Sequence, residues 1–284
     1  MSKETPQSEQ PPKKLSPEQF SHVCDSLVDY QISPDLFNYV NEALENNRFV
    51  AFLLTHQSYF DIEVCRYICE HVNQGRENPI NLFLEYSSPA VGKNIGNLLV
   101  KRKEIYDNCH LIMLGVVRGS DKKHEKYKDL ITQKMIDESD VNDKLYNEKT
   151  SQGRCIAFIP FEATLHSGRI NKETGKRNGM KKVTNNPKLI QAIRQKAIIV
   201  PFGIDGSYKI VDAEEHELSN LFYEAIFTKN PKKVVTAKIG QPIDLLLPEY
   251  KGIPTRELYE RVTLKVAGLV SREAQGDYQQ YLAV

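Results

Sequence analysis

A histidine and an aspartate five residues apart stand at the end of an apolar run in this sequence. The run Phe49–Leu54 ends at Thr55-His56, and Asp61 follows where a helical pattern begins. A neutral imidazole at a strand end can take a proton from a hydroxyl group near neutral pH. A carboxylate that accepts the other ring N–H fixes the imidazole tautomer. The pair therefore has the residue types and spacing of a general base with an orienting acid.

The same residues also fit a purely structural role. Ser58 and Asp61 have the spacing of a helix-capping pair, and an acid in the first turn of a helix is favourable without any catalysis. A His followed five residues later by an Asp is also expected by chance in about a third of chains of this composition. The spacing alone leaves both interpretations open.

Two helix starts and six strands are predicted around this pair. Ser16-Pro17-Glu18 and Ser33-Pro34-Asp35 each combine an N-cap Ser with Pro at the first helical position. Strand-sized apolar runs follow, at Phe49–Thr55, Asn81–Tyr86, Leu111–Val117, Cys155–Phe161, Ala197–Phe202 and Val234–Ile239. Helical patterns separate several of them, at Tyr59–Val72, Glu125–Glu138 and Pro187–Lys196. A further long helical pattern covers Thr255–Ala283, with Gly268 and Gly276 as weak points.

Strands and helices in turn predict an α/β fold with a mostly parallel central sheet flanked by helices. A short N-terminal helical hairpin precedes the sheet and a C-terminal helix follows it. We divide the chain into a disordered leader (1–15), rich in Ser, Glu, Gln, Pro and Lys, the hairpin (16–47) and the main domain (48–284). Strand runs without alternation indicate a sheet covered on both faces.

Ligand sites in such folds lie at the carboxyl ends of the strands. Four predicted strands end in polar or unusual residues, at His56–Asp61, Arg118-Gly119, Glu162–Arg169 and Gly203–Tyr208. Arg118 is suited to bidentate binding of phosphate, or else is a solvated charge after a strand. Glu162 and Thr164 begin a segment that continues into a basic loop, in which Arg169 is the first Arg; most lysines of that loop are expected to be solvated.

Composition excludes several classes of protein. The formal net charge is +1 and there is no basic arm with interleaved aromatics, so nucleic-acid binding is not expected. The apolar runs are too short to cross a membrane, and no signal peptide is recognised. Five cysteines without a signal peptide indicate reduced thiols and a cytoplasmic location, with peripheral membrane contact left open. Neither a metal cage nor a phosphate-binding Gly-rich loop is evident, so no cofactor is predicted.

Five segments in order resemble the glycerolipid acyltransferase family, the glycerol-3-phosphate and 1-acylglycerol-3-phosphate acyltransferases. His56–Asp61 resembles the first block of that family, a His, four residues and an Asp. Later blocks are similar to the segments Leu114–Arg118, Phe161–Thr164 with Ser167-Gly168, Ile199–Pro201 and Ile239–Ile243. The resemblance covers about Phe49 to Ile243, and five blocks in register are more specific than any one of them.

The resemblance implies a fatty acyl transfer from an acyl thioester, acyl-CoA or acyl-carrier protein, to glycerol-3-phosphate or a lysophospholipid. It implies His56 as general base, Asp61 as its orienter and Arg118 at the substrate phosphate. Glu162 and Thr164 would shape the acceptor site, and Arg169 is a candidate for the phosphate.

The third block departs from the family pattern, since Ala163 replaces a Gly and Leu165 replaces an Arg. These departures leave open an acceptor that is a non-phosphorylated hydroxyl or an amine, and they motivate one alternative function, a non-catalytic lipid-binding or scaffold protein on the same fold. A thioesterase in which His56 activates water is a further alternative.

Overall fold

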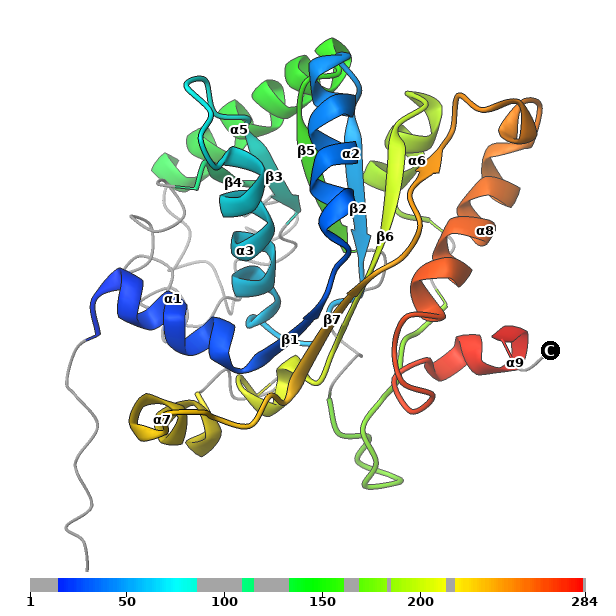
Figure 1. Cartoon of the computed structure of the whole chain (residues 1–284). Coiled ribbons are helices and arrows are strands. Elements are labelled where there is room, and N and C mark those ends of the chain that lie inside the picture. The colour runs from blue at the N-terminus through cyan, green and yellow to red at the C-terminus, as the bar shows by residue number, and fades with distance from the viewer. Residues whose placement is uncertain are drawn as a thin grey trace, which may run out of the picture.

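A single mixed sheet organises the chain (Figure 1). The computed structural model describes residues 15–85, 109–114, 133–160, 169–182, 185–212 and 218–282. Its strands follow the order β1-β7-β6-β2-β5-β3-β4, and β8 also pairs with β6. They are β1 (Val28–Gln31), β2 (Val50–Leu54), β3 (Leu82–Glu85), β4 (Leu111–Leu114), β5 (Ile156–Pro160), β6 (Ile198–Asp205), β7 (Val235–Ile239) and β8 (Ile243–Asp244).

The five strands β2 to β6 run parallel, as the sequence predicts. The strands β7 and β8 are antiparallel to β6, and β1 is parallel to β7. Strand β2 lies between β5 and β6, so its carboxyl end is central to the sheet. Because later strands of the chain lie on both sides of β2, the connections diverge there, where ligand sites form in parallel sheets.

Apolar side chains on both faces explain the uninterrupted hydrophobic runs. Along β2, Val50, Phe52 and Leu54 belong to one buried cluster, while Ala51 and Leu53 belong to the other. All five residues are buried. The sheet is therefore covered on both sides, as predicted from the runs that do not alternate.

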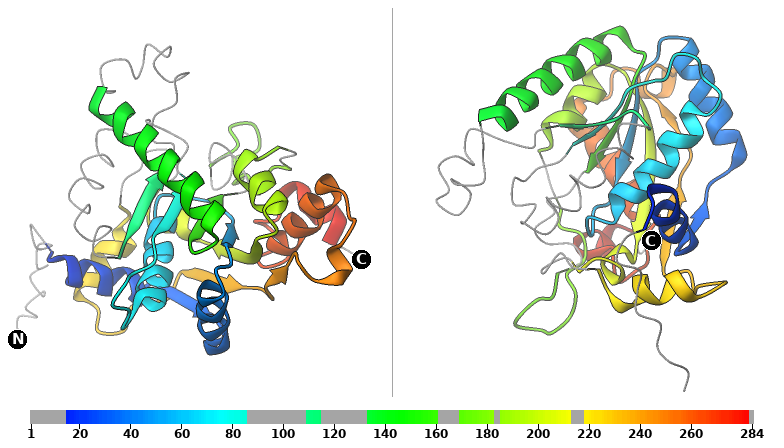
Figure 2. Two further views of the ribbon diagram at one scale, coloured as in Figure 1. Left: turned by 90° about the horizontal axis from the view of Figure 1, so that it is seen from above. Right: turned by 90° about the vertical axis from the view of Figure 1, so that its left-hand side faces the viewer.

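Helices form a layer on each face of the sheet (Figure 2). The helices that contribute to the first cluster are α1 (Pro17–Ser26), α2 (Pro34–Glu45), α3 (Asp61–Asn73) and α7 (Asn220–Phe227). Those that contribute to the second are α5 (Gln133–Gln152), α6 (Pro187–Arg194) and α8 (Thr255–Ala267). Short helical turns complete the set, η3 (Ser207–Lys209), η4 (Pro248–Tyr250), η5 (Gly276–Tyr278) and α9 (Gln279–Leu282).

The N-terminal helices begin where the sequence predicts, but they do not both precede the first strand. Strand β1 lies between α1 and α2 and joins the central sheet by pairing with β7. The expectation of an uninterrupted helical pair is therefore wrong. The strand was missed because it is only four residues long and only Val28 is fully buried, so it gives no apolar run.

Helix α5 also differs from its predicted position. It continues to Gln152, well past the expected end at Glu138, while residues 125–132 lie outside the described residues. Its sequence is rich in Lys, Asp and Glu and has little apolar periodicity, which is why its second half was missed. Tyr146 is the large side chain that it buries. The long helix predicted over Thr255–Ala283 is not continuous. Helix α8 ends just before Gly268, one of its two weak points, and only the short turns η5 and α9 follow, from Gly276 onward.

Candidate active site

The end of β2 is fastened to β6 through Thr55. Its hydroxyl donates to the Ile204 carbonyl at 2.8 Å and accepts from the Ile204 amide at 2.7 Å, replacing a regular ladder contact. The Thr55 amide donates to the Phe202 carbonyl at 3.1 Å. Because Thr55 is still bonded to β6, His56 is the first residue beyond the carboxyl end of β2 that leaves the sheet.

His56 and Asp61 are in direct contact. Nδ1 of His56 lies 2.7 Å from Oδ2 of Asp61, and the two residues are 7% and 2% exposed. The same Oδ2 accepts from the amides of Gln57 at 2.8 Å and Ser58 at 3.1 Å. Among the described residues, the other oxygen, Oδ1, is buried without a hydrogen-bond partner. The carboxylate is thus fixed by one oxygen, which also sets the orientation of the imidazole.

The capping interpretation accounts for only part of this geometry. Helix α3 begins at Asp61 with Phe60 as N-cap, slightly later than the predicted start at Tyr59. Ser58 Oγ accepts from the Phe60 amide at 3.2 Å, whereas a capping box would place it on the Asp61 amide. Asp61 caps the turn through the Ser58 amide and holds His56 with the same atom, so the structural and the orienting roles coexist.

Gln57 connects this turn to two other segments. Its side-chain carbonyl accepts from the Gly206 amide at 2.8 Å, and its amide nitrogen donates to Asp205 Oδ1 at 3.2 Å. Asp205 Oδ2 in turn accepts from the Ser271 amide at 2.9 Å. The end of β6 and the segment after α8 therefore support the backbone beside His56. The strand predicted to end at Phe202 continues to Asp205, so only the last part of the predicted strand end Gly203–Tyr208 lies beyond β6. No signal in the sequence indicated the roles of Asp205 and Gln57.

Gly206 is required at this position. It has φ of +87°, and a Cβ there would lie 2.4 Å from the Val234 carbonyl oxygen. A side chain would therefore be both strained and in collision with the backbone that precedes β7. The amide that holds Gln57 depends on this glycine.

A small pocket lies next to Gln57, on the side of the basic loop. Arg177, Asn178, Tyr208 and Glu273 contribute to its wall. The guanidinium of Arg177 lies 4.0 Å from the centre of the Tyr208 ring, a cation–π contact that holds the loop against the end of β6. This part of the predicted basic loop therefore reaches the neighbourhood of His56.

Of the other predicted site residues, the structure describes only Arg169. It is partly buried, and its carbonyl accepts from the Asn178 amide at 2.7 Å, so it belongs to the same loop as the pocket wall. Arg169 Nε is buried, and within the described chain it has no hydrogen-bond partner. Arg118, Glu162 and Thr164 lie outside the described residues, as do Ala163 and Leu165.

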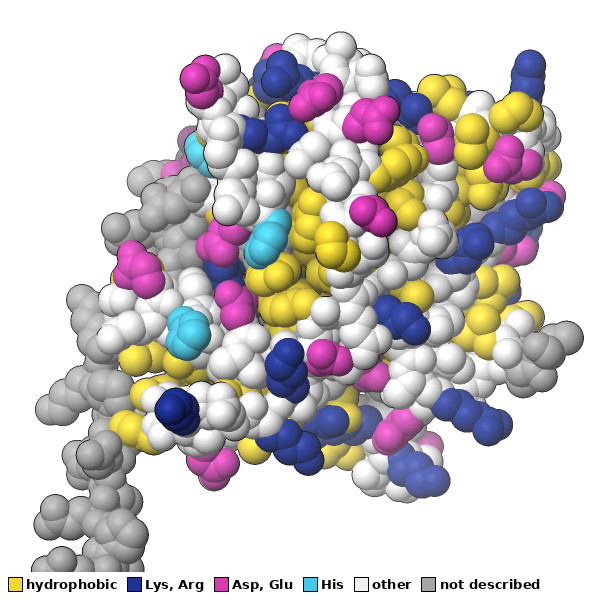
Figure 3. Space-filling view, in the orientation of Figure 1, with side chains coloured by type: hydrophobic (Ala, Val, Ile, Leu, Met, Phe, Trp, Pro, Cys, Tyr) yellow, Lys and Arg dark blue, Asp and Glu magenta, His cyan; other side chains and the backbone are white. Residues whose placement is uncertain are grey.

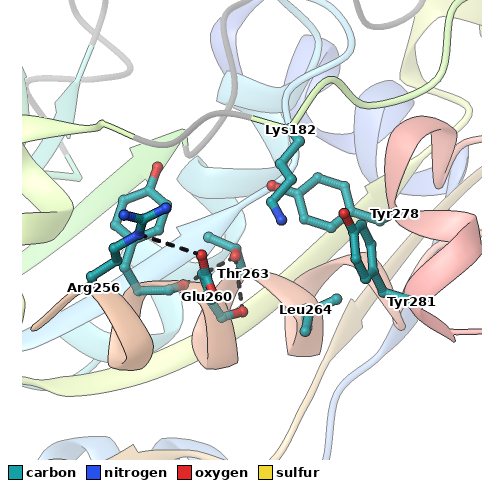
Figure 4. Close-up of a pocket in the computed structure, with 8 residues that line it drawn as sticks. Lys182, Arg256, Glu260, Thr263, Leu264, Tyr278 and Tyr281 are labelled. Carbon is teal, nitrogen blue, oxygen red and sulfur yellow. Dashed lines mark hydrogen bonds and ion pairs between the residues drawn. The ribbon is translucent and has the colours of Figure 1, made fainter. Parts of the chain in front are cut away.

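A larger hollow lies along the outer side of α8 (Figure 4). Lys182, Tyr278 and Tyr281 face Thr263 and Leu264 across it, and Arg256 and Glu260 lie at the other end of the row on α8. The ammonium of Lys182 lies 4.4 Å from the centre of the Tyr281 ring. This hollow contains none of the site residues predicted from the sequence, so we do not place the chemistry there.

Helix α3 carries a second buried ionic group that sequence analysis missed. Arg66 is completely buried and forms ion pairs with three carboxylates. They are Asp25 of α1 at 2.6 Å, Glu63 at 3.2 Å and Glu70 at 2.5 Å. Asp25 also accepts from the Tyr30 hydroxyl at 2.9 Å, which ties β1 into the same group. Burial is the main cause that raises the pKa of Tyr30 above its usual range, so this phenol stays protonated.

All five cysteines are buried and none is in a disulfide. Burial raises the pKa of Cys155 to about 12 and that of Cys65 and Cys69 well above the usual range. Within the described ranges no group of three or more His, Cys, Asp or Glu side chains is arranged to hold a metal ion. None of the described helices is long and apolar enough to cross a bilayer.

No protein-family model matches the chain, and no curated protein matches it at a significant level. The residues around His56 and the ordered motifs of the sequence are therefore the basis for proposing a function.

Proposed function

We propose that the protein is an O-acyltransferase in which His56 is the general base and Asp61 orients it. The observation that carries the proposal is the 2.7 Å contact between His56 Nδ1 and Asp61 Oδ2 at the carboxyl end of the central parallel strand. With Nδ1 donating to the carboxylate, the imidazole lone pair is on Nε2. This is the atom that takes the proton from an incoming hydroxyl group.

The reaction follows from that tautomer. The hydroxyl oxygen of the acceptor attacks the carbonyl carbon of an acyl thioester while its proton passes to Nε2. The tetrahedral intermediate then collapses, the carbon–sulfur bond breaks, and the thiolate takes the proton back from the imidazolium. Asp61 stabilises the imidazolium between these steps, because its carboxylate is already in contact with Nδ1.

Substrates are proposed from the resemblance of the sequence blocks. The donor is acyl-CoA or an acyl-carrier protein, and the acceptor is glycerol-3-phosphate or a lysophospholipid. Arg118 and Arg169 are proposed to bind the acceptor phosphate, and Glu162 and Thr164 to shape the acceptor site. No cofactor is needed, since the thioester is already activated. A cytoplasmic location is proposed because the five buried cysteines form no disulfide.

The test is release of free thiol from acyl-CoA with each acceptor in turn. We expect release that depends on acceptor and is lost in His56→Ala. His22→Ala is the matched control, because it makes the same change at an exposed histidine on α1 and should leave the rate unchanged. Equal rates for His56→Ala and the wild type would refute the assigned base. Release that continues at full rate without any acceptor would indicate a thioesterase.

One observation favours the non-catalytic alternative. Asp61 accepts from two backbone amides, so part of its arrangement is explained by the start of α3 alone. Binding of a lysophospholipid without transfer from any acyl donor would support a lipid-binding protein on this fold. Detectable transfer by the wild type would exclude it.

A further inference from the structure

Helix α7 carries large apolar side chains on both of its faces. Phe222 and Ala225 are buried, and the Phe222 ring lies 5.1 Å from the Phe20 ring of α1. On the other side, Leu221, Tyr223 and Phe227 are 38%, 40% and 47% exposed. A surface helix normally presents polar residues to water, so the outer face of α7 calls for an explanation.

Exposed lysines follow α7 directly in the chain. We call the α7 surface the three exposed side chains Leu221, Tyr223 and Phe227 together with the exposed lysines of the segment between α7 and β7, Lys229, Lys232 and Lys233. Glu224 lies on the same helix, and Asp29 approaches Lys233 to 3.8 Å. In Figure 3, apolar side chains and Lys or Arg side chains lie together along the lower edge of the molecule, over α1, α7 and β7.

The α7 surface lies at the same end of the sheet as His56. Asp205, the last residue of β6, pairs with Thr236 at the start of β7, directly after the lysines that follow α7. His56 leaves the sheet beside the same strand, since Leu54 of β2 pairs with Phe202. The candidate base and the apolar surface are therefore both at the carboxyl ends of the parallel strands.

We propose that the α7 surface lies on a bilayer that contains anionic lipid. A short helix with exposed aromatic and aliphatic side chains, flanked by lysines, has the chemistry of an element that rests in a membrane interface. The apolar side chains enter the headgroup region, while lysine ammonium groups meet the lipid phosphates. This inference rests on the proposed function for its purpose, because it brings His56 to the surface where a lysophospholipid acceptor is found.

The composition of the surface favours a membrane over a protein partner. Lysine is depleted at protein–protein interfaces, whereas Arg is enriched there. The basic residues between α7 and β7 are Lys229, Lys232 and Lys233, and none is an Arg. A lysine at a bilayer keeps its charge in the headgroup layer. On an anionic surface, each lysine strengthens membrane binding about fivefold.

The test measures binding of the full chain to lipid vesicles, with no acyl donor or acceptor present. Sedimentation is compared for phosphatidylcholine vesicles and for vesicles with about 30 mol% phosphatidylserine. We expect the wild type to bind the anionic vesicles at least about tenfold more tightly. The double variant Tyr223→Glu/Phe227→Glu should lose about a hundredfold in vesicle affinity, since each aromatic ring leaves the interface and a charge opposes the phosphates.

A matched control lies at the other end of the sheet. Leu246 and Leu247 are 59% and 44% exposed and follow β8, which pairs with the start of β6. The variant Leu246→Glu/Leu247→Glu should bind vesicles as the wild type does. Likewise, Lys229→Glu/Lys232→Glu should weaken binding to anionic vesicles about tenfold or more, whereas Lys251→Glu/Lys265→Glu should not.

The outcomes separate this inference from the proposed function. Equal vesicle binding by the α7 variants and their controls overturns the membrane surface, whatever the activity. A concentration-dependent dimer that is lost in Tyr223→Glu/Phe227→Glu also overturns it, in favour of a second copy of the chain. His56→Ala should still bind vesicles normally, so absence of acyl transfer leaves the membrane inference intact.

Discussion

Asp61 and Arg66 lie five residues apart on α3, and both are buried and charged, yet their surroundings differ. Arg66 is surrounded by carboxylates that occupy its three guanidinium nitrogens. Asp61 concentrates its contacts on one oxygen, and the other is buried without a hydrogen-bond partner in the described part of the chain. Arg66 links α3 to α1, whereas Asp61 holds an imidazole at a strand end.

Asp61 and Arg66 together show that burial and charge do not by themselves mark a functional site. Both groups are removed from water, and both would be costly to leave unpaired. The difference is what they hold. Asp61 holds the imidazole that is proposed as the base, while Arg66 joins α3 to α1. Mutations at the two places should therefore separate activity from stability.

The largest effect is expected at His56. If His56 is the base, as proposed, His56→Ala should lower kcat/KM for acyl transfer about 10³-fold or more. The midpoint of thermal unfolding should change little, since the Asp61 carboxylate keeps its two backbone amide donors. Steady-state kinetics and a thermal melt of the same sample measure both. A large drop in the melting temperature with unchanged activity per folded molecule would mean that His56 has a structural role and not a catalytic one.

Arg66 should behave in the opposite way. Arg66→Met should lower the free energy of unfolding by about 3–5 kcal/mol, because it removes the cation that pairs with the buried Glu63 carboxylate. Activity per folded molecule should stay close to that of the wild type. Urea unfolding measures the change. The double variant Arg66→Met/Glu63→Leu removes both charges and should recover much of the loss, which a purely steric effect of Met would not allow.

A conservative change at Asp61 sharpens the comparison. In Asp61→Asn the side-chain oxygen can still accept from the Gln57 and Ser58 amides, but it no longer stabilises an imidazolium. Activity should fall about 100-fold while the free energy of unfolding changes by less than about 1 kcal/mol. Kinetics and urea unfolding are again compared. Unchanged activity would mean that Asp61 only caps α3.

The smallest effect concerns an ion pair outside α3. Arg48 holds Asp244 through two hydrogen bonds, at 2.6 and 3.0 Å, and this contact lowers the pKa of Asp244. A lowered pKa in the folded state adds stability above the unfolded value of about 3.9, and this is lost as pH falls through the folded value.

Asp244→Asn should therefore cost about 1 kcal/mol at pH 7, and the difference should shrink as pH falls below about 3.9. Melting temperatures of both proteins across this range provide the measurement. Glu257→Gln is the control, because its pair with Arg261 is half-exposed and should change the melting temperature little at any pH.

Local patterns in the sequence were sufficient for much of the fold and for the central pair. Strands β2, β5 and β6 are evident because both faces of the sheet are covered, so each gives an uninterrupted apolar run. The contact between His56 and Asp61 was predictable because a strand end and a helix start separate them by only five residues. Fold class follows from the same strand and helix order.

Long-range polar pairs were not predictable. Gln57 and Asp205 are separated by 148 positions, and Arg66 and Asp25 by 41, and a single sequence carries no signal that joins them. Taken alone, each of these four residues is of a polar or charged type that is usually exposed to solvent. Strand β1 was missed for a related reason, because its pairing with β7 comes from residues far along the chain.

The pairing of β1 with β7 also bears on how the protein folds during synthesis. Val28 pairs with Val235, so β1 leaves the ribosome about 200 residues before its partner strand exists. Loop-closure entropy makes such distant contacts slow to form. Until β7 arrives, both β1 and the end of β6 present open hydrogen-bonding edges, and nascent chains that stall in this interval are the ones most prone to aggregate.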